Sequence, residues 1–552
     1  MLGLRSKRRP TNMAQHSHCL ALMTRKTAQH WSQQQHDPIP SFHRSCQDHS
    51  RRDLHWQEEP ERYYKDHPCN RHCEDNSLPR LCKYTWLLEN YYVMSKACHD
   101  CPFNQTHCYL PHCVSADGVM RGIKTANRIL PGPRVEVCEG DTIEVTVMNA
   151  MEVSEGTSIH WHGIHQRGTP FMDGVAMLTQ CPIPAHAKFT YRFTANNPGT
   201  HFWHAHAGVQ RADGLFGSLV IRRPPSRESQ YLLYDYDLTD HVIIVNDWLA
   251  EMTVNRFAAH HHDSGDNKPE LMLINGRGQY REVKDSNGTS LFTPRATFTV
   301  KPGKRYRFRV INAGILNCPI QFSVNSHTMT MIASDGHSFE PYTVDMFNIF
   351  SGERYDFVLY ADKEENLRNY WIRVKGLADC NVKSANQTAI LKYEGAPDDL
   401  PPESLLEPAP GGTINSTTTL EQVKAMDARG ELNRNKTKAP LKDSVTVPDG
   451  GYTIVRFKAD NPGIWFFHCH IEFHAEIGMG LFFQVGNKSQ FPKPPKNFPK
   501  CGDFLNDESD DTEKVTVTQT VKCTSGCSDV VPWSALVLLV ALSITFKMGI
   551  NI

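Results

Sequence analysis

The sequence lacks several features that would place it in a common protein class. It carries almost no net charge, because 59 Lys+Arg balance 60 Asp+Glu to a formal charge of −1. The composition therefore shows no excess of positive charge of the kind that attracts nucleic acids. No apolar run typical of a signal peptide precedes Tyr63. Charged residues are 22% and hydrophobic residues 39% of the chain, which excludes wholesale disorder. We therefore expect a largely folded protein of about three domains.

Cysteine, in contrast, is abundant. The count of 17 is odd, so at least one thiol is free, metal-bound or paired with another chain. In an oxidising compartment, ten cysteines are expected to form a disulfide framework: Cys69, Cys73, Cys82, Cys98, Cys101, Cys108, Cys113, Cys138, Cys181 and Cys318. An alternative is a zinc site made by Cys98, Cys101, His99, His107 and His112. Secretion and glycosylation agree with six Asn-x-Ser/Thr sites: Asn104, Asn287, Asn386, Asn415, Asn435 and Asn487.

The two ends of the chain differ from its centre. Residues 1–62 are rich in His, Gln and Arg, which predicts a disordered or foreign leader, and residues 63–117 form a Cys-rich segment. After a linker over 491–529, residues 530–546 are almost wholly apolar, which predicts a transmembrane helix or a lipid-anchor signal. A buried C-terminal helix is the alternative. We expect an extracellular protein or one held at the outer face of the plasma membrane by this segment.

Short alternating apolar runs between Gly, Pro and Asn turns predict an all-β fold. Examples are Val135–Val137, Thr142–Val147, Thr297–Val300, Tyr306–Ile311 and Tyr370–Val374. A period of two with turns about every ten residues is typical of antiparallel β-sandwiches. We expect one sandwich over 118–224, a second over 230–396 and part of a third over 397–490.

Two segments of the chain repeat one another. Arg192–His206 and Arg456–His470 share Arg, Phe, Ala, Asn, Pro, Gly, a second Phe and both histidines of a His-x-His pair. Strand residues two apart face the same way, so each pair presents two imidazoles on one side. Histidines that merely fill a polar face are the alternative. The candidate metal ligands from this repeat are His204, His206, His468 and His470.

Two further patterns point to a metal. His160 and His162 form a third His-x-His pair in the segment HWHG. Cys469 stands between two of the repeat histidines and is followed by His474 and Met479. A thiolate, an imidazole and a thioether together select copper in an electron-transfer site. A copper on the Cys469 sulfur would be joined by two short covalent paths to metals on the flanking imidazoles.

Taken together, the motifs resemble three of the four copper signatures of the multicopper oxidases. They are HWHG at 160–163, HFWHAHAG at 201–208 and HCHIEFHAEIGM at 468–479. Residues 116–133, 273–280 and 445–454 resemble the insect laccase-type branch, and the similarity runs from about Cys69 to Cys501. The resemblance implies tandem cupredoxin-like Greek-key β-sandwich domains that bind copper.

The resemblance also implies a role for each candidate ligand. His160 would serve the type 2 copper, and Cys469 and His474 the type 1 copper, with Met479 as its axial ligand. The type 3 pair would be held by His162, His204, His206, His468 and His470. Cys469, His468 and His470 would carry the electrons, and are the expected catalytic residues.

The implied reaction takes single electrons from phenols or catechols and reduces O2 to water with four of them. The copper motifs do not separate a laccase from a ferroxidase, whose substrate is Fe2+. An alternative from another class is a non-catalytic, membrane-tethered β-sandwich protein that retains partial copper sites.

One family signature is absent from the sequence. The motif HPxHLHG supplies three histidines, one to each copper type, yet no histidine lies between His337 and His468. Residues 397–490 are also few for a sandwich, which needs roughly 100 residues. We therefore expect a truncated third domain, incomplete copper loading and no oxidase activity in this chain.

Two other groups of histidines have simpler interpretations. His260–His262 could bind a metal, but a solvated loop is favoured because no converging ligands are visible. His201 is expected to support the neighbouring ligands rather than to bind metal itself.

Overall fold

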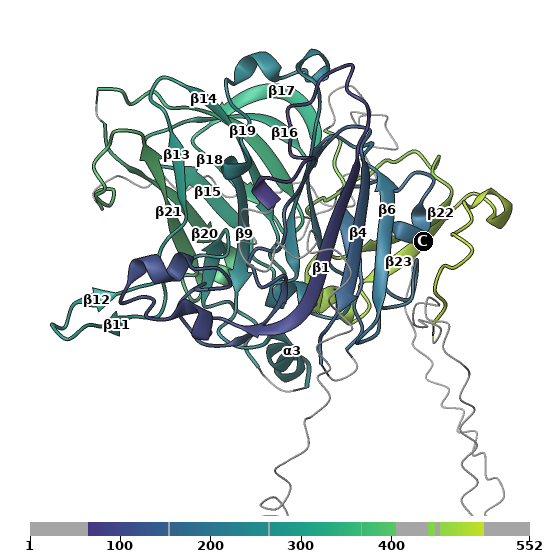
Figure 1. The fold of residues 1–552 in the computed structure, drawn as a ribbon, viewed down its shortest axis with the longest axis horizontal. Coiled ribbons are helices and arrows are strands. Elements are labelled where there is room, and N and C mark those ends of the chain that lie inside the picture. The colour runs from purple at the N-terminus through teal and green to yellow at the C-terminus, as the bar shows by residue number, and fades with distance from the viewer. Residues whose placement is uncertain are drawn as a thin grey trace, which may run out of the picture. The chain divides into compact units, whose positions relative to one another are not determined.

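The protein is described by a computed structural model over residues 64–152, 155–262, 265–365, 367–403, 440–447 and 453–501 (Figure 1). These ranges all belong to one contact unit. The predictions for the leader over 1–62 and for the apolar segment over 530–546 fall outside them. No helix within these ranges has the length and apolar character needed to span a membrane.

The first sandwich consists of two four-stranded sheets. One sheet has the order β2-β1-β4-β6 and contains β1 (Leu81–Tyr92), β2 (Gly122–Ala126), β4 (Thr142–Asn149) and β6 (Lys188–Thr194). The other has the order β3-β8-β7-β5 and contains β3 (Val135–Cys138), β5 (Ile159–His162), β7 (Gly199–Ala205) and β8 (Phe216–Arg222). Alternate residues of β4 are buried, as the period of two predicts. Trp86, Trp161 and Trp203 fill the space between the sheets, and all three are fully buried.

The second sandwich is larger. Its six-stranded sheet has the order β10-β9-β14-β19-β16-β17 and contains β9 (Val242–Trp248), β10 (Leu271–Ile274), β14 (Arg305–Asn312), β16 (Met329–Ser334), β17 (His337–Val344) and β19 (Arg354–Tyr360). Its five-stranded sheet has the order β13-β21-β20-β15-β18 and contains β13 (Thr297–Val300), β15 (Ile320–Val324), β18 (Met346–Ile349), β20 (Tyr370–Gly376) and β21 (Asn386–Tyr393). Phe308, Phe322 and Phe357 pack in the core. The all-β prediction is confirmed.

The third part of the chain contributes a single strand pair within the described residues. Strands β22 (Gly463–His468) and β23 (Gly480–Val485) form a two-stranded antiparallel sheet. Its side chains are poorly covered, and Phe467, Leu481 and Phe482 are each about half exposed or more. The rest of the third sandwich expected over 397–490 is not visible in the described part of the chain.

The remaining elements are short. A hairpin pairs β11 (Val283–Lys284) with β12 (Ser290–Leu291). The described α-helices are α3 (Thr253–His262) and α5 (Glu472–Glu476). The 3-10 helices are η2 (Lys96–Cys98), η3 (Gln105–Tyr109), η4 (Pro170–Met172), η5 (Gln210–Asp213), η6 (Pro225–Arg227), η7 (Tyr231–Leu233), η8 (Thr239–His241), η9 (Ala378–Asn381) and η10 (Lys488–Gln490).

Strand direction differs from the prediction of purely antiparallel sheets. The pairs β1–β4, β3–β8, β9–β14 and β13–β21 are parallel. Each of these pairs joins strands that are not consecutive in the chain. A parallel neighbour arises where the intervening chain crosses to the opposite end of the sheet before the next strand begins, and alternation along a single strand cannot reveal this.

Twelve cysteines form disulfides in the described residues: Cys69–Cys82, Cys73–Cys138, Cys98–Cys113, Cys101–Cys108, Cys181–Cys501 and Cys318–Cys380. The framework prediction is confirmed, with Cys380 and Cys501 as additional partners. The zinc alternative at Cys98 and Cys101 is wrong, because both sulfurs are already bonded. Of the cysteines in the described ranges, Cys469 alone is free.

Candidate metal centre

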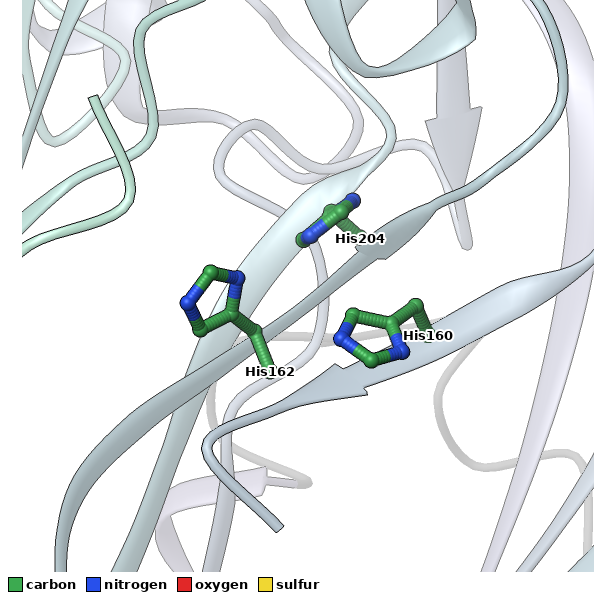
Figure 2. Close-up of side chains that lie close together, drawn as sticks. All are labelled: His160, His162 and His204. Carbon is green, nitrogen blue, oxygen red and sulfur yellow. The ribbon is translucent and has the colours of Figure 1, made fainter. Parts of the chain in front are cut away.

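Strands β5 and β7 place histidines on the outer side of the first sandwich. Trp161 points into the core between the sheets, so His160 and His162 face the opposite way. The register of the two strands sets His160 opposite His204. The ligand-capable atoms of His160, His162 and His204 all lie within 4.8 Å of one another, and Figure 2 shows the three rings turned toward a common space.

The histidines from the repeat lie at strand ends. Strand β7 ends at Ala205 and β22 at His468, so His206 and His470 lie just beyond them. The prediction of both histidines within one strand is therefore wrong in each pair. Even so, the His468 and His470 rings are nearly parallel, at 28° and 6.0 Å between centroids. The chain leaves the strand without turning the second imidazole away.

Imidazoles of the first sandwich meet imidazoles at the end of β22 in two close pairs. His206 Nε2 lies 3.3 Å from His468 Nε2, and His162 Nδ1 lies 3.2 Å from His470 Nε2. Two ligands of a tetrahedral ion with metal–nitrogen distances of about 2.0–2.1 Å are about 3.3 Å apart. Both pairs therefore have the spacing of two nitrogens that share a metal.

Hydrogen bonds determine which nitrogen of each ring can bind a metal. The Nδ1 atoms of His160, His204 and His468 lie 2.8, 2.8 and 2.9 Å from the carbonyl oxygens of Asp173, Ala205 and Cys469. A carbonyl only accepts, so we assign the proton to Nδ1 in each ring. Nε2 then keeps its lone pair. In His204 this atom is buried without any hydrogen-bond partner, as expected of a ligand that awaits a cation.

His162 has the opposite arrangement. Its Nε2 lies 3.3 Å from Asp443 Oδ1 and 3.0 Å from Ser444 Oγ, so we assign the proton to Nε2 and the lone pair to Nδ1. Arg354 donates two hydrogen bonds to the Asp443 carboxylate. This ion pair holds the pKa of Asp443 well below its usual range, although burial acts in the opposite direction. A carboxylate on the far nitrogen of a histidine orients the ring and increases its basicity toward a metal.

His470 is held by residues of the second sandwich. Its Nδ1 lies 2.9 Å from Ser351 Oγ, and that hydroxyl donates to the Gly314 carbonyl oxygen, so Nδ1 is the donor. Arg211 Nη1 lies 2.8 Å from both ring nitrogens, while its Nη2 donates to the His470 carbonyl oxygen. The guanidinium is thus a competing partner for Nε2.

Arg211 also forms an ion pair with an acidic group of helix α5. Its Nη2 lies 2.6 Å from Glu472 Oε2, and both side chains are almost fully buried. Burial raises the pKa of Glu472 to about 7, although Arg211 acts in the opposite direction. The carboxyl beside His470 can therefore gain or lose a proton near neutral pH.

Burial keeps the imidazoles neutral. It lowers the pKa of His162 to about 3 and that of His468 to about 4, and it lowers the pKa values of His204, His206 and His470 well below the usual range. Neighbouring cations and rings lower the last three further. Neutral imidazoles are the form that binds metals.

The thiol of Cys469 lies at a separate position. Its sulfur is 3.6 Å from His474 Nδ1, close to the separation expected for two ligands of one ion with metal–sulfur and metal–nitrogen distances of about 2.3 and 2.0 Å. Cys469 N donates to the carbonyl oxygen of Met479, whose side chain is 58% exposed. No cluster of three His, Cys, Asp or Glu groups in the described residues includes Cys469.

The other predicted histidines have structural roles. His260–His262 end helix α3 rather than forming a loop, and His260 Nδ1 lies 3.1 Å from the Gly265 carbonyl oxygen. His201 is buried, with Nε2 2.8 Å from the Asn197 carbonyl oxygen, so its ring is fixed by the turn that precedes β7. The sequence reading missed Asp443 and Arg354, because no spacing rule connects them to His162.

Comparison with known proteins agrees with this geometry. Residues 111–226, 239–396 and 416–489 each match the multicopper oxidase family. Laccase-4 of Thanatephorus cucumeris is 30% identical over 491 residues, covering 70% of this chain and 88% of the relative. The chain belongs to the multicopper oxidase family. Laccase-3 of Trametes villosa is 32% identical over 429 residues, which is 67% of this chain and 86% of the relative.

A solved structure of the family has the same fold. The laccase from Botrytis aclada superposes with a TM-score of 0.59 at 25% identity, covering 75% of this chain and 89% of that one. Multicopper oxidases bind copper at type 1, type 2 and type 3 sites. The imidazole pairs of this chain fit such metal sites, whereas the Cys469–His474 pair is one imidazole short of the two that a trigonal copper–thiolate site takes.

Proposed function

We propose that this chain is a laccase-type multicopper oxidase polypeptide of the insect-like branch whose 552-residue form does not turn over. In a complete enzyme of this type, copper supplies one-electron oxidation of phenols or catechols coupled to four-electron reduction of O2. Here one histidine is missing from each of the type 1, type 2 and type 3 centres, because the HPxHLHG motif is absent.

One observation carries the proposal. Cys469 and His474 lie at ligand spacing, yet the chain has no histidine between His337 and His468 to complete their site. The exposed Phe467 and Leu481 further support the loss of an internal segment, since such apolar side chains are normally covered by the opposite sheet of a sandwich.

The test compares two forms of the protein. The 552-residue chain and a form with a family HPxHLHG segment inserted before Ile414 are purified and loaded with copper. We expect no blue type 1 absorption and no turnover from the first, and both from the second. Cys469→Ser in the restored form is the matched control and should abolish the blue colour. Blue absorption together with turnover from the 552-residue chain would contradict the proposal.

The substrate class needs a separate comparison. The relatives are named laccases, which supports phenols and catechols rather than Fe2+ as the substrate class of this chain. The restored form is therefore expected to oxidise a diphenol faster than Fe2+. A preference for Fe2+ would instead make it a ferroxidase.

We further propose that the protein acts outside the cell, secreted or held at the plasma membrane by residues 530–546. Six disulfides are expected of an oxidising compartment. Surface labelling of intact cells that express a tagged chain tests this, and protection of the tag in unpermeabilised cells would contradict it.

A further inference from the structure

The five-stranded sheet of the second sandwich carries a polar hollow beside a possible acceptor for an N-linked glycan. The hollow has a volume of about 240 Å3, and residues of β20, η9 and β21 line it. One lining residue, Asn386, begins an Asn-x-Thr sequence that ends at Thr388. We propose that Asn386 carries an N-linked glycan whose first sugar residue lies in this hollow. The proposal rests on the extracellular location proposed above and on no copper site.

The register of β20 and β21 places the acceptor beside two cations. Lys375 lies directly opposite Asn386, and Arg373 lies directly opposite Thr388. Partners across two strands project from the same face of a sheet. Val374 lies between the two cations and belongs to the core, so Arg373 and Lys375 point outward. The acceptor and the two cations therefore share the outer face of the sheet.

The side chain of Asn386 is available for the transfer of a glycan. It is exposed, and its Nδ2 donates to the Ser384 carbonyl oxygen at 2.7 Å. An amide nitrogen carries two hydrogens, so the second can be replaced. Transfer forms a bond between Nδ2 and C1 of the first N-acetylglucosamine and breaks the bond from C1 to the pyrophosphate of a lipid-linked oligosaccharide donor. The proton displaced from Nδ2 leaves with the pyrophosphate.

The walls of the hollow suit a sugar. N-acetylglucosamine presents hydroxyls and an acetamide group, which donate and accept hydrogen bonds. The exposed Lys375 offers an ammonium donor, and the exposed Asn381 offers an amide that both donates and accepts. The volume is below the roughly 300–1,000 Å3 of a pocket for a drug-sized ligand. The hollow therefore fits one sugar residue better than a larger ligand.

A second acceptor sequence provides a comparison inside the same chain. Asn287 is exposed in the turn between β11 and β12, and this hairpin protrudes from the rest of the fold (Figure 1). A Cβ at the neighbouring Gly288 would meet no atom within 4 Å. A glycan on Asn287 would therefore extend into open space, whereas one on Asn386 would begin against the protein.

Occupancy of the acceptor is measured first. The full 552-residue chain is produced in cultured mammalian cells, once as it stands and once behind a cleavable secretion signal, and glycopeptides are analysed by mass spectrometry. We expect a glycan on Asn386 that Asn386→Gln abolishes. An unmodified Asn386 in the form with the added signal would overturn the proposal. A glycan found only in that form supports the site and contradicts the extracellular location instead.

The rate of enzymatic release tests whether the first sugar lies in the hollow. A peptide N-glycosidase must reach the bond at Nδ2, and release rates in the folded protein are divided by those in the denatured protein to cancel effects of local sequence. We expect release from Asn386 to be about tenfold slower than from Asn287, a factor that corresponds to about 1.4 kcal/mol. Equal rates would overturn the position of the sugar.

Variants of the walls complete the test. Lys375→Ala and Asn381→Ala should each bring the release rate at Asn386 closer to the rate at Asn287. Lys284→Ala, at an exposed lysine on β11, is the matched control and should change neither rate. Circular dichroism checks that each variant folds. An unchanged rate at Asn386 in both wall variants would show that the sugar does not contact the hollow.

Discussion

At the scale of single residues, the centre depends on small groups that allow the imidazoles to approach the second sandwich. Gly352 has φ +85°, and a Cβ there would lie 2.9–3.0 Å from the His470 ring. The position therefore needs glycine twice, for its backbone conformation and for the close contact. Gly288 has φ +82° with no atom within 4 Å of such a Cβ. A substitution at Gly288 therefore shows the effect of the backbone conformation alone on stability.

We expect Gly352→Ala to lower the melting temperature more than Gly288→Ala. Backbone strain of about 1–3 kcal/mol applies to both, but only the first substitution displaces His470. Differential scanning calorimetry measures the two shifts, and copper titration should show weaker binding for Gly352→Ala alone. Equal behaviour of the two variants would contradict the close contact.

A buried acid should make stability depend on pH. Burial raises the pKa of Asp117 to about 6, and the backbone N–H of Val119 donates to its carboxylate. The folded pKa exceeds the unfolded one, so this contribution to stability is present below pH 3.8 and is lost as the pH rises through about 6. The side-chain amide of Asp117→Asn does not ionise with pH, and its oxygen can still accept the hydrogen bond from the Val119 N–H.

The stability of Asp117→Asn relative to wild type should therefore increase from pH 4 to pH 7.5. A shift of about two units corresponds to about 3 kcal/mol. Melting temperatures of both proteins across this range provide the measurement. Asp285→Asn is the control: backbone N–H groups lower the pKa of this exposed carboxyl from 3.8, so its contribution changes only at lower pH and the variant should track wild type over this range. A difference between Asp117→Asn and wild type that does not change with pH would refute the assignment.

At the scale of elements, the strand pair β22–β23 carries both the turn that contains Cys469 and His474 and a set of uncovered apolar side chains. Phe467 and Leu481 lie directly opposite each other in the pair, and they are 50% and 47% exposed. Phe482, which alternates with Leu481 along β23, is 61% exposed as well. These apolar side chains are available for contact with another molecule.

We expect these side chains to cause self-association. The double variant Phe467→Ser and Leu481→Lys should increase the monomer fraction in size-exclusion chromatography with light scattering. Tyr360→Ser, at a residue 51% exposed on β19, removes an exposed aromatic ring elsewhere and should leave the fraction unchanged. An unchanged monomer fraction in the double variant would show that another surface causes the self-association.

At the scale of the whole molecule, distant parts of the chain are held together by contacts between the first sandwich and later segments. The Cys181–Cys501 disulfide links residues 320 apart in sequence. Phe498 packs on Phe171 and Phe189 nearby. Arg309 Nη1 on β14 donates to Thr200 Oγ1 on β7 at 2.7 Å, which adds a buried contact between the two sandwiches.

Replacing both cysteines of Cys181–Cys501 by serine should destabilise the protein more than the same change at Cys101–Cys108, whose separation is 7. Loop-closure entropy favours the longer link by up to about 3 kcal/mol. Thermal unfolding of the two double variants checks the order. A larger loss from the short link would mean that strain or local packing outweighs chain entropy.

The sequence predicted those features that depend only on residues within one short segment. Strands β3, β4, β13, β14 and β20 follow from the alternation of apolar and polar residues in the sequence, because a strand's period of two is visible along a single segment. The His-x-His pairs and Cys469 follow from spacing for the same reason. Strand direction and the helical conformation of His260–His262 did not follow, since both depend on packing against distant segments.

The sequence by itself determined which side chains this protein can offer to a metal: imidazoles in pairs, a cysteine between two of them, and no histidine between His337 and His468. Only the tertiary structure decided which nitrogen of each imidazole is free. That choice depends on hydrogen-bond partners such as Asp443, which lies 281 residues from His162 in the chain. A proton on one ring nitrogen excludes a metal there, so the fold selects the ligand atoms by positioning acceptors that no local pattern reveals.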